Sequence, residues 1–142
     1  MTSIHFSFNA PDRLLTACRI AARRHEAGDA LAVYCRNLTR LKHFDRLLWD
    51  YERAAFVPHV DETDPLAERT GVVLYANPPP PTRPWVLNLD DDCIPAAAGF
   101  RHIIEVVSAD ASDRRQGRAR WRQYQAAGFN IVQHDVADND LP

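Results

Sequence analysis

Five arginines and a tryptophan lie close together between Asp110 and Asn130, in a stretch that has no acidic residue after Asp113. Residues three and four positions apart are neighbours on a helix, so a helix here would place several of them on one face. That face carries Arg114, Arg118, Trp121, Arg122 and Gln125. An indole beside several guanidinium groups suits a ligand with negative charge and an apolar or aromatic end. The alternative is a solvated basic face, with Trp121 and Tyr124 at the edge of the core.

Three consecutive aspartates, Asp90 to Asp92, follow a predicted strand and are the strongest enzymatic candidate. Active sites in open α/β sheets gather at strand ends, and clustered carboxylates can bind Mg²⁺. The alternative is a polar turn between a strand and a helix. The six histidines have neither HxH nor HExxH spacing for zinc, and the three cysteines form no CxxC pair. Cys18 and Cys35 lie in apolar contexts and are predicted to be small buried hydrophobes.

No other pattern for catalysis is present in the sequence. Between Phe8 and Pro11 there is no glycine, which excludes both a P-loop and a G-x-G-x-x-G turn after the first strand. Ser108 and Ser112 lack the G-x-S-x-G elbow of a hydrolase nucleophile. Nothing assembles a base, a nucleophile and an oxyanion site. We therefore predict a protein that is not an enzyme and needs no cofactor or metal.

Composition limits the kind of partner. The formal net charge is −2 over 142 residues, whereas nucleic-acid-binding domains are usually strongly basic. The arginine cluster is therefore a local feature, which favours a small acidic partner over a long polyanion. Neither a signal sequence nor an apolar run of ~20 residues is present, so we expect a cytoplasmic protein with reduced cysteines.

The elements that position these residues alternate between strands and helices. Helical spacing predicts helices over residues 11–28, 37–51 and 110–128, with Pro11 as the first residue of one and Asp12 in its first turn. Asn37 or Thr39 is expected to open the second helix, and Asp110 to cap the third. Alternating or continuous apolar runs predict strands over residues 3–8, 30–35, 55–57, 71–75, 85–89, 102–107 and 129–133. Residues 61–69 are predicted to form an exposed loop.

This alternation predicts a three-layer α/β domain with a mostly parallel central sheet flanked by helices. The fold is Rossmann-like but lacks the nucleotide-binding glycine loop. We expect a single domain over residues 1–134, followed by an acidic tail over residues 135–142 that frays.

A second candidate surface lies near the end of the second predicted helix. Trp49 is followed, after a charged segment, by Phe56, Val57 and Pro58. Aromatic residues are the usual anchors of protein interfaces, so these residues offer a rigid apolar patch. The alternative is that Trp49 and Phe56 both close the core.

Two stretches of the chain resemble the chi subunit of bacterial DNA polymerase III holoenzyme. Residues 118–130 are similar to the C-terminal helix and turn of that family. Arg46-Leu47-Leu48-Trp49, followed by Phe56-Val57-Pro58-His59, is similar to its Leu-Trp and Phe-Val-Pro-His run. The resemblance covers most of the chain and is weak between Val60 and Pro84.

The resemblance implies a non-catalytic accessory subunit that connects the clamp loader, through the psi subunit, to the acidic tail of single-stranded-DNA-binding protein. It implies a psi-facing surface made of Trp49, Phe56, Val57 and Pro58. That tail ends in an aromatic residue with a free carboxylate, and Arg118 is favoured to bind it, with Tyr124 as a wall of the pocket. The full candidate set for the tail is Arg114, Arg118, Trp121, Arg122 and Tyr124.

Two other functions remain open from the sequence. One is a metal-assisted phosphoryl or nucleic-acid enzyme built around Asp90, Asp91 and Asp92. The other is direct binding of single-stranded DNA through the arginine-rich helix, for which a steep dependence of affinity on salt is the expected sign.

Overall fold

Seven short strands form one sheet, and every pairing between neighbouring strands is parallel. The computed structural model describes residues 1–51 and 56–142. Across the sheet the strands lie in the order β3-β4-β2-β5-β6-β1-β7. Their bounds are β1 Ser3–Ala10, β2 Leu31–Tyr34, β3 His59–Asp61, β4 Val72–Tyr75, β5 Trp85–Asn88, β6 His102–Ser108 and β7 Asn130–Asp135. The predicted parallel α/β sheet is confirmed.

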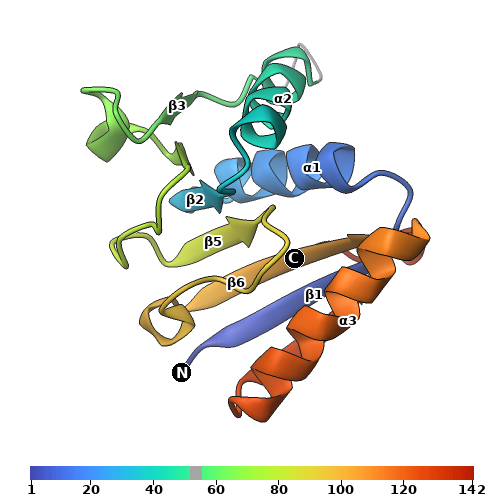
Figure 1. The fold of residues 1–142 in the computed structure, drawn as a ribbon. Helices are drawn as coiled ribbons and strands as arrows, with labels where there is room; N and C mark the ends of the chain where they lie inside the picture. Colours follow the sequence, from blue (N-terminus) through green and yellow to red (C-terminus); the bar gives the residue numbers. More distant parts are fainter. Residues whose placement is uncertain (52–55) are drawn as a thin grey trace.

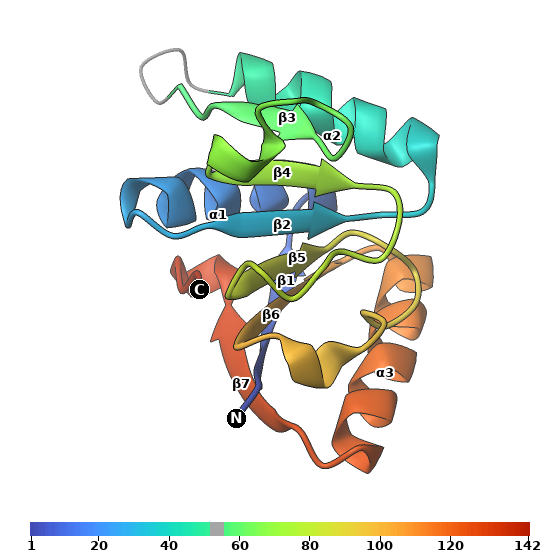
Figure 2. The same cartoon turned by 90° about the vertical axis from the view of Figure 1, so that its left-hand side faces the viewer.

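Helices cover both faces of this sheet (Figures 1 and 2). Helices α1 (Arg13–Glu26) and α2 (Leu38–Asp50) lie on one face, and α3 (Ala111–Ala126) lies on the other. Alternation along each strand supplies two cores: Leu31 and Val33 of β2 pack under α1 and α2, whereas Ala32 and Tyr34 face the α3 side. The three-layer architecture is confirmed. In the described part of the chain no helix is both long and apolar enough to cross a membrane.

Each α-helix begins at a side-chain cap. The carboxylate of Asp12 accepts from the Leu15 backbone N–H at 2.9 Å, so α1 begins at Arg13 and the prediction that Pro11 opens it was wrong. Asn37 and Asp110 cap α2 and α3 in the same way, as predicted. An acidic or amide side chain fills this position well because it satisfies a backbone N–H that the helix leaves unpaired.

The third strand lies later in the chain than predicted. Ala55 lies outside the described residues, and Phe56 and Val57 are not in a strand. The strand is His59–Asp61 instead, which pairs with β4 at the edge of the sheet. The loop that follows it contains a single 3-10 turn, Ala67–Arg69. A second such turn, Ala97–Gly99, lies between β5 and β6.

The acidic tail is packed against the sheet, in contrast to the fraying expected from its composition. A 3-10 turn, Val136–Asp138, follows β7 directly. Val136 is buried, and Leu141 packs against the core under α1 and α2. Two apolar side chains therefore hold a segment whose other residues are mostly polar.

The cysteines behave as small hydrophobic residues. Cys18 and Cys35 are fully buried, as predicted, and all three cysteines are free thiols. Burial raises the pKa of Cys18 to about 12 and that of Cys93 to about 11. Thiols with such pKa values are poor nucleophiles at neutral pH.

One buried carboxylate connects α3 to the middle of the sheet. Glu105 of β6 is fully buried and accepts three hydrogen bonds, from Arg120 Nε at 2.8 Å, Tyr124 Oη at 2.7 Å and Asn88 Nδ2 at 2.7 Å. Burial opposes the charge of Arg120, but the Glu105 carboxylate outweighs it and raises the pKa of that guanidinium group. The cluster joins β5, β6 and α3.

This cluster predicts a large difference between two arginines of the same helix. Arg120→Met leaves the Glu105 carboxylate buried without its cation, which should lower the free energy of unfolding by ~3–5 kcal/mol. Arg122→Ala, at an exposed position of α3, should change it by less than ~0.5 kcal/mol. Urea unfolding measures both. Equal losses from the two variants would contradict the buried ion pair.

Candidate functional site

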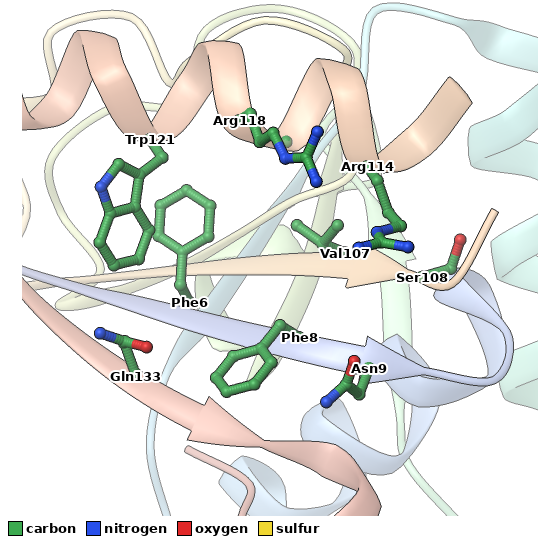
Figure 3. Close-up of a pocket in the computed structure, with 10 residues that line it drawn as sticks. Phe6, Phe8, Asn9, Val107, Ser108, Arg114, Arg118, Trp121 and Gln133 are labelled. Carbon is green, nitrogen blue, oxygen red and sulfur yellow. The ribbon is translucent and has the colours of Figure 1, made fainter. Parts of the chain in front are cut away.

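An open pocket of about 240 Å³ lies between the outer part of α3 and the strands beneath it (Figure 3). Helix α3 contributes the upper wall, and β1, β6 and β7 contribute the floor and the far wall. The lining residues are Phe6, Phe8, Asn9, Val107, Ser108, Arg114, Gly117, Arg118, Trp121 and Gln133. Three residues singled out from the sequence, Arg114, Arg118 and Trp121, are therefore brought together at one site.

One end of the pocket is aromatic. The half-buried Trp121 ring meets the ring of Phe6 edge-on, with centroids 4.9 Å apart at an angle of 62°. Phe8, two residues further along β1, points to the same face of the sheet and is half-buried. Figure 3 shows both phenylalanines on the strand below α3. These rings offer an apolar wall to a flat or aliphatic group.

The other end of the pocket carries positive charge. Arg114 and Arg118 are exposed, and within residues 1–51 and 56–142 neither forms an ion pair. Figure 3 shows both side chains extending from α3 toward Val107 and Ser108. A guanidinium group presents a planar fork of donors that matches a carboxylate. The pocket can therefore bind a molecule that combines a carboxylate with a ring.

Asn9 lies at the rim in an uncommon backbone conformation. Its φ is 60°, and the register of β1 against β6 shifts between Ser7 and Ala10. Asparagine tolerates this left-handed region better than most residues. The Asn9 amide donates to Asp135 Oδ1 at 3.1 Å, which ties the end of β1 to the end of β7.

The residues of the far wall of the pocket were not predicted from the sequence. Phe6, Phe8, Asn9 and Gln133 come from β1 and β7, which are distant in the chain from α3 and from each other. Alternation indicated that Phe6 and Phe8 share a face of their strand. The sequence carried no signal that this strand lies beside β6 and β7 and under α3.

Two of the predicted pocket residues do not line the pocket. Tyr124 was expected to wall it, but the ring is buried among Phe6 and Phe129, and its hydroxyl donates to Glu105. Burial, followed by the Glu105 charge, raises the pKa of Tyr124. Tyr124 lies two helical turns after Gly117, so both residues are on the side of α3 that faces the sheet. For this reason Tyr124 does not reach the pocket. Arg122 is exposed but is not among the lining residues.

The depth of the pocket depends on how closely α3 approaches β6. A Cβ atom built on Gly117 would lie 2.7 Å from Val107 Cγ2 and 3.0 Å from Val107 Cγ1. Cβ atoms are essentially never found as close as 2.7 Å to another heavy atom, so glycine at this position allows the helix to lie directly on the strand. A larger residue would lift α3 and separate Arg118 and Trp121 from the floor.

The second candidate surface is exposed and aromatic. The side chains of Trp49 and Phe56 are 48% and 59% exposed, with ring centroids 5.5 Å apart. The buried ring of His59 lies against Trp49, with centroids 4.3 Å apart. His59 is held in turn by Val57 O at 2.8 Å and Asp45 Oδ1 at 2.7 Å. The alternative, in which Trp49 and Phe56 both close the core, is contradicted by this exposure.

The other two residues of this predicted surface lie deeper. Val57 is 2% exposed and packs in the core under α1 and α2, and Pro58 is half-buried. Val57 therefore cannot contact a partner unless the fold changes. Of these four residues, Trp49 and Phe56 are the exposed ones.

The three aspartates of the enzymatic alternative are paired with arginines near the start of α2. Asp90 is buried and accepts from the backbone N–H and from Nε of Arg36, both at 3.0 Å. Burial works against this charge, but the Arg36 contacts lower the pKa of Asp90. Asp92 pairs with Arg36 as well, and Asp91 pairs with Arg40 at 3.0 Å. Among the described residues no group of three or more histidine, cysteine or acidic side chains could hold a metal ion.

Gly117 gives a direct test of the pocket geometry. Gly117→Ala should be destabilising, because an overlap with Val107 costs ~1–3 kcal/mol and exceeds the ~1 kcal/mol that alanine gains in helix propensity. Val107→Ala removes the overlapping methyl groups, so the double variant should be more stable than the sum of the two single effects predicts. Urea unfolding of the four proteins measures this coupling. Strictly additive effects would contradict the close contact.

Comparisons with known proteins agree with the resemblance noted in the sequence. Residues 1–132 match the family described as DNA polymerase III chi subunit, HolC. The chain is 27% identical to DNA polymerase III subunit chi of Pseudomonas aeruginosa, over 94% of this chain and 96% of the relative. It is 25% identical to the Escherichia coli protein of that name (80% and 79% covered) and 24% identical to the Haemophilus influenzae one (84% and 85%). The chain therefore belongs to the family of DNA polymerase III chi subunits.

Proposed function

We propose that this chi subunit is a non-catalytic connector that joins the clamp loader, through psi, to the C-terminal tail of single-stranded-DNA-binding protein. The observation that carries the proposal is the pocket under α3. Its aromatic end and its two unpaired arginines suit a peptide with carboxylates and a terminal aromatic residue. Under this proposal the protein works in the cytoplasm of a bacterium.

The proposed peptide enters with its C-terminus first. The terminal ring packs against Trp121 and Phe8, and the α-carboxylate pairs with Arg118, which lies one turn before Trp121. Arg114 lies one turn further toward the start of α3 and meets a carboxylate upstream in the peptide. Charge-assisted bidentate pairs give both affinity and a fixed direction for the bound chain.

The proposed psi surface is the exposed pair Trp49 and Phe56. Two neighbouring large aromatic side chains in water are costly unless a partner covers them, and aromatic residues are frequent hot spots of interfaces. His59 and Asp45 support the Trp49 ring from below. The patch is therefore presented in a fixed geometry before a partner arrives.

The two surfaces lie on opposite sides of the sheet. Trp49 lies near the end of α2, whereas the pocket lies beside α3, and Figure 1 shows these helices on the two faces. One bound partner does not block the other, which a connector requires. Linking two sites on one rigid body raises the effective concentration of each partner for the other.

The two other functions have less support. The carboxylates of Asp90, Asp91 and Asp92 are paired with Arg36 and Arg40, so they are not free to bind a cation. The basic residues of α3 are on a molecule with a net charge of −2, and the aromatic end of the pocket fits a single ring better than a continuous strand.

Calorimetry with a C-terminal tail peptide tests the pocket. Arg118→Ala should weaken binding by ~2–5 kcal/mol if the ion pair is desolvated. Arg122→Ala is the matched control, because this arginine is on the same helix outside the pocket, and it should cost less than ~1 kcal/mol. Removing the final aromatic residue of the peptide should also weaken binding. Equal losses of peptide affinity in the two arginine variants, or an unchanged affinity for the peptide without its final residue, would contradict the pocket. The basic side of α3 would then be a solvated surface without a specific site.

The salt dependence separates this function from DNA binding. A peptide held by a few carboxylate contacts should lose affinity only slowly as the salt concentration rises. A DNA strand that contacts the protein through many successive phosphates should lose affinity steeply. Titration of a single-stranded oligonucleotide at several salt concentrations serves as the comparison. Tighter and steeply salt-dependent binding of the oligonucleotide would favour the DNA-binding alternative.

Phe56 tests the second surface. Phe56→Ala should leave the unfolding midpoint nearly unchanged, because the side chain is 59% exposed, and should weaken the complex with psi by ~2 kcal/mol. Val57→Ala, at a neighbouring buried position, should instead lower stability. Co-purification and thermal unfolding of both variants measure this. Loss of folding in Phe56→Ala, or full retention of psi, would contradict the assignment.

A further inference from the structure

Three histidines form a continuous row across the α1 face of the sheet, and none of them lines either surface described above. His102, His5 and His134 come from the adjacent strands β6, β1 and β7. His102 Nδ1 lies 3.1 Å from His5 Nε2, and His5 Nδ1 lies 3.0 Å from His134 Nε2. The row ends at the C-terminal segment, where His134 Nδ1 lies 2.9 Å from Asp140 Oδ1.

Several charged groups surround this row. Trp85 stacks on His102 with centroids 4.0 Å apart, and the Arg24 guanidinium of α1 lies over Trp85 at 4.5 Å. Arg24 pairs with Asp29 at 2.9 Å. Burial lowers the pKa of His5 to about 4, assisted by His134, His102 and Arg24. Burial and the neighbouring Arg101 lower the pKa of His102, against the opposing effect of Asp29.

The geometry limits how many protons the row can hold. Each of the two contacts between imidazole rings needs one proton, because one nitrogen donates and the other accepts. The contact with Asp140 needs a third proton, on His134 Nδ1, since a carboxylate only accepts. The outer Nε2 of His102 is the one nitrogen left, so an unbroken row holds three or four protons. Three neutral histidines carry three protons, and the row therefore accepts a single added proton.

We propose that this row is a pH-sensitive latch for the C-terminal segment, residues 136–142. A second added proton places two N–H groups against each other and separates two of the rings. His134 is the one that can move, because β7 is an edge strand whereas β1 and β6 have neighbours on both sides. When His134 turns away, either its bond to Asp140 breaks or the segment moves with it.

The released segment is the one that covers part of the core under α1. Val136 is buried in that core and Leu141 packs against it. Hydrogen bonds add to these contacts: Asp140 N donates to Asp135 O at 3.2 Å, Ala137 N donates to Asp135 Oδ1 at 3.0 Å, and Arg19 donates to Asn139 Oδ1 at 3.5 Å. Pro142 is buried as well. Under the proposal, the contact of Asp140 with His134 is needed in addition to the burial of Val136 and Leu141 to keep the end of the chain ordered.

The direction of the pH dependence follows from the excluded proton. In the closed row the pKa values of His5 and His102 are lowered, so these two histidines bind protons more readily once the row has opened. The closed row cannot accept a second added proton without losing a contact between rings. The segment is therefore held fully above pH ~6.5 and is lost as the pH falls toward 4. Each excluded proton raises the equilibrium constant for opening roughly tenfold per pH unit in this range.

Heteronuclear NMR on the full chain tests the latch. At pH 7.5 the amides of residues 136–142 should be as ordered as those of β6, and imidazole nitrogen spectra should show His5, His102 and His134 protonated on Nδ1. At pH 4.5 the segment should become disordered while β6 remains ordered. A segment that stays ordered at pH 4.5, or that is lost only together with β6, would overturn the proposal.

Variants distinguish the latch from general acid sensitivity. His5→Leu removes both contacts between rings and with them the limit on protons, so the segment should stay ordered at pH 4.5. Asp140→Ala should release the segment already at pH 7.5, and Asp138→Ala, at a nearby exposed position, should not. His43→Gln, an exposed histidine on α2, should leave the transition unchanged. Release of the segment in His5→Leu at the wild-type pH, or an ordered segment in Asp140→Ala, would contradict the mechanism.

Discussion

The ion pair between Glu105 and Arg120 is the constraint on which the arrangement of α3 depends. A carboxylate in the middle of a core is unfavourable unless hydrogen bonds and a counter-charge satisfy it, and Glu105 has three donors and one cation. Two of these donors, on Arg120 and Tyr124, belong to α3, so the rotation of the helix about its axis is fixed. The pocket residues Arg118 and Trp121 are presented on the outer side as a consequence.

Much of the fold could be predicted from the sequence because its signals are local. Apolar runs predicted six of the strands, and helical spacing with capping residues predicted the three helices, because each of these signals depends on neighbouring residues. The order of these elements predicted the layered architecture. The strand at His59–Asp61 was missed because three residues carry little periodicity. The tail was misjudged because composition suggested fraying, whereas Val136 and Leu141 dock on the core.

The candidate site was predictable only on the helix that carries it. Spacing brought Arg114, Arg118 and Trp121 to one face, and the structure has them in one pocket. Spacing could not tell that Arg120, among five similar arginines, is fully buried, because its partner Glu105 lies on a separate strand. The floor of the pocket depends on which strands are neighbours, and that is a property of the whole topology.

The strand order has a consequence for how the chain folds as it is synthesised. The first strand, Ser3–Ala10, has as its neighbours β6 and β7, which end at Ser108 and Asp135. It therefore has no partner in the sheet until β6 has been made, which is complete only at Ser108, whereas β2, β3 and β4 can pair once Tyr75 has been made. Contacts between such distant residues close large loops and form slowly. In that interval β1 is unpaired and its apolar side chains Ile4, Phe6 and Phe8 are uncovered, so a newly made chain needs protection from aggregation.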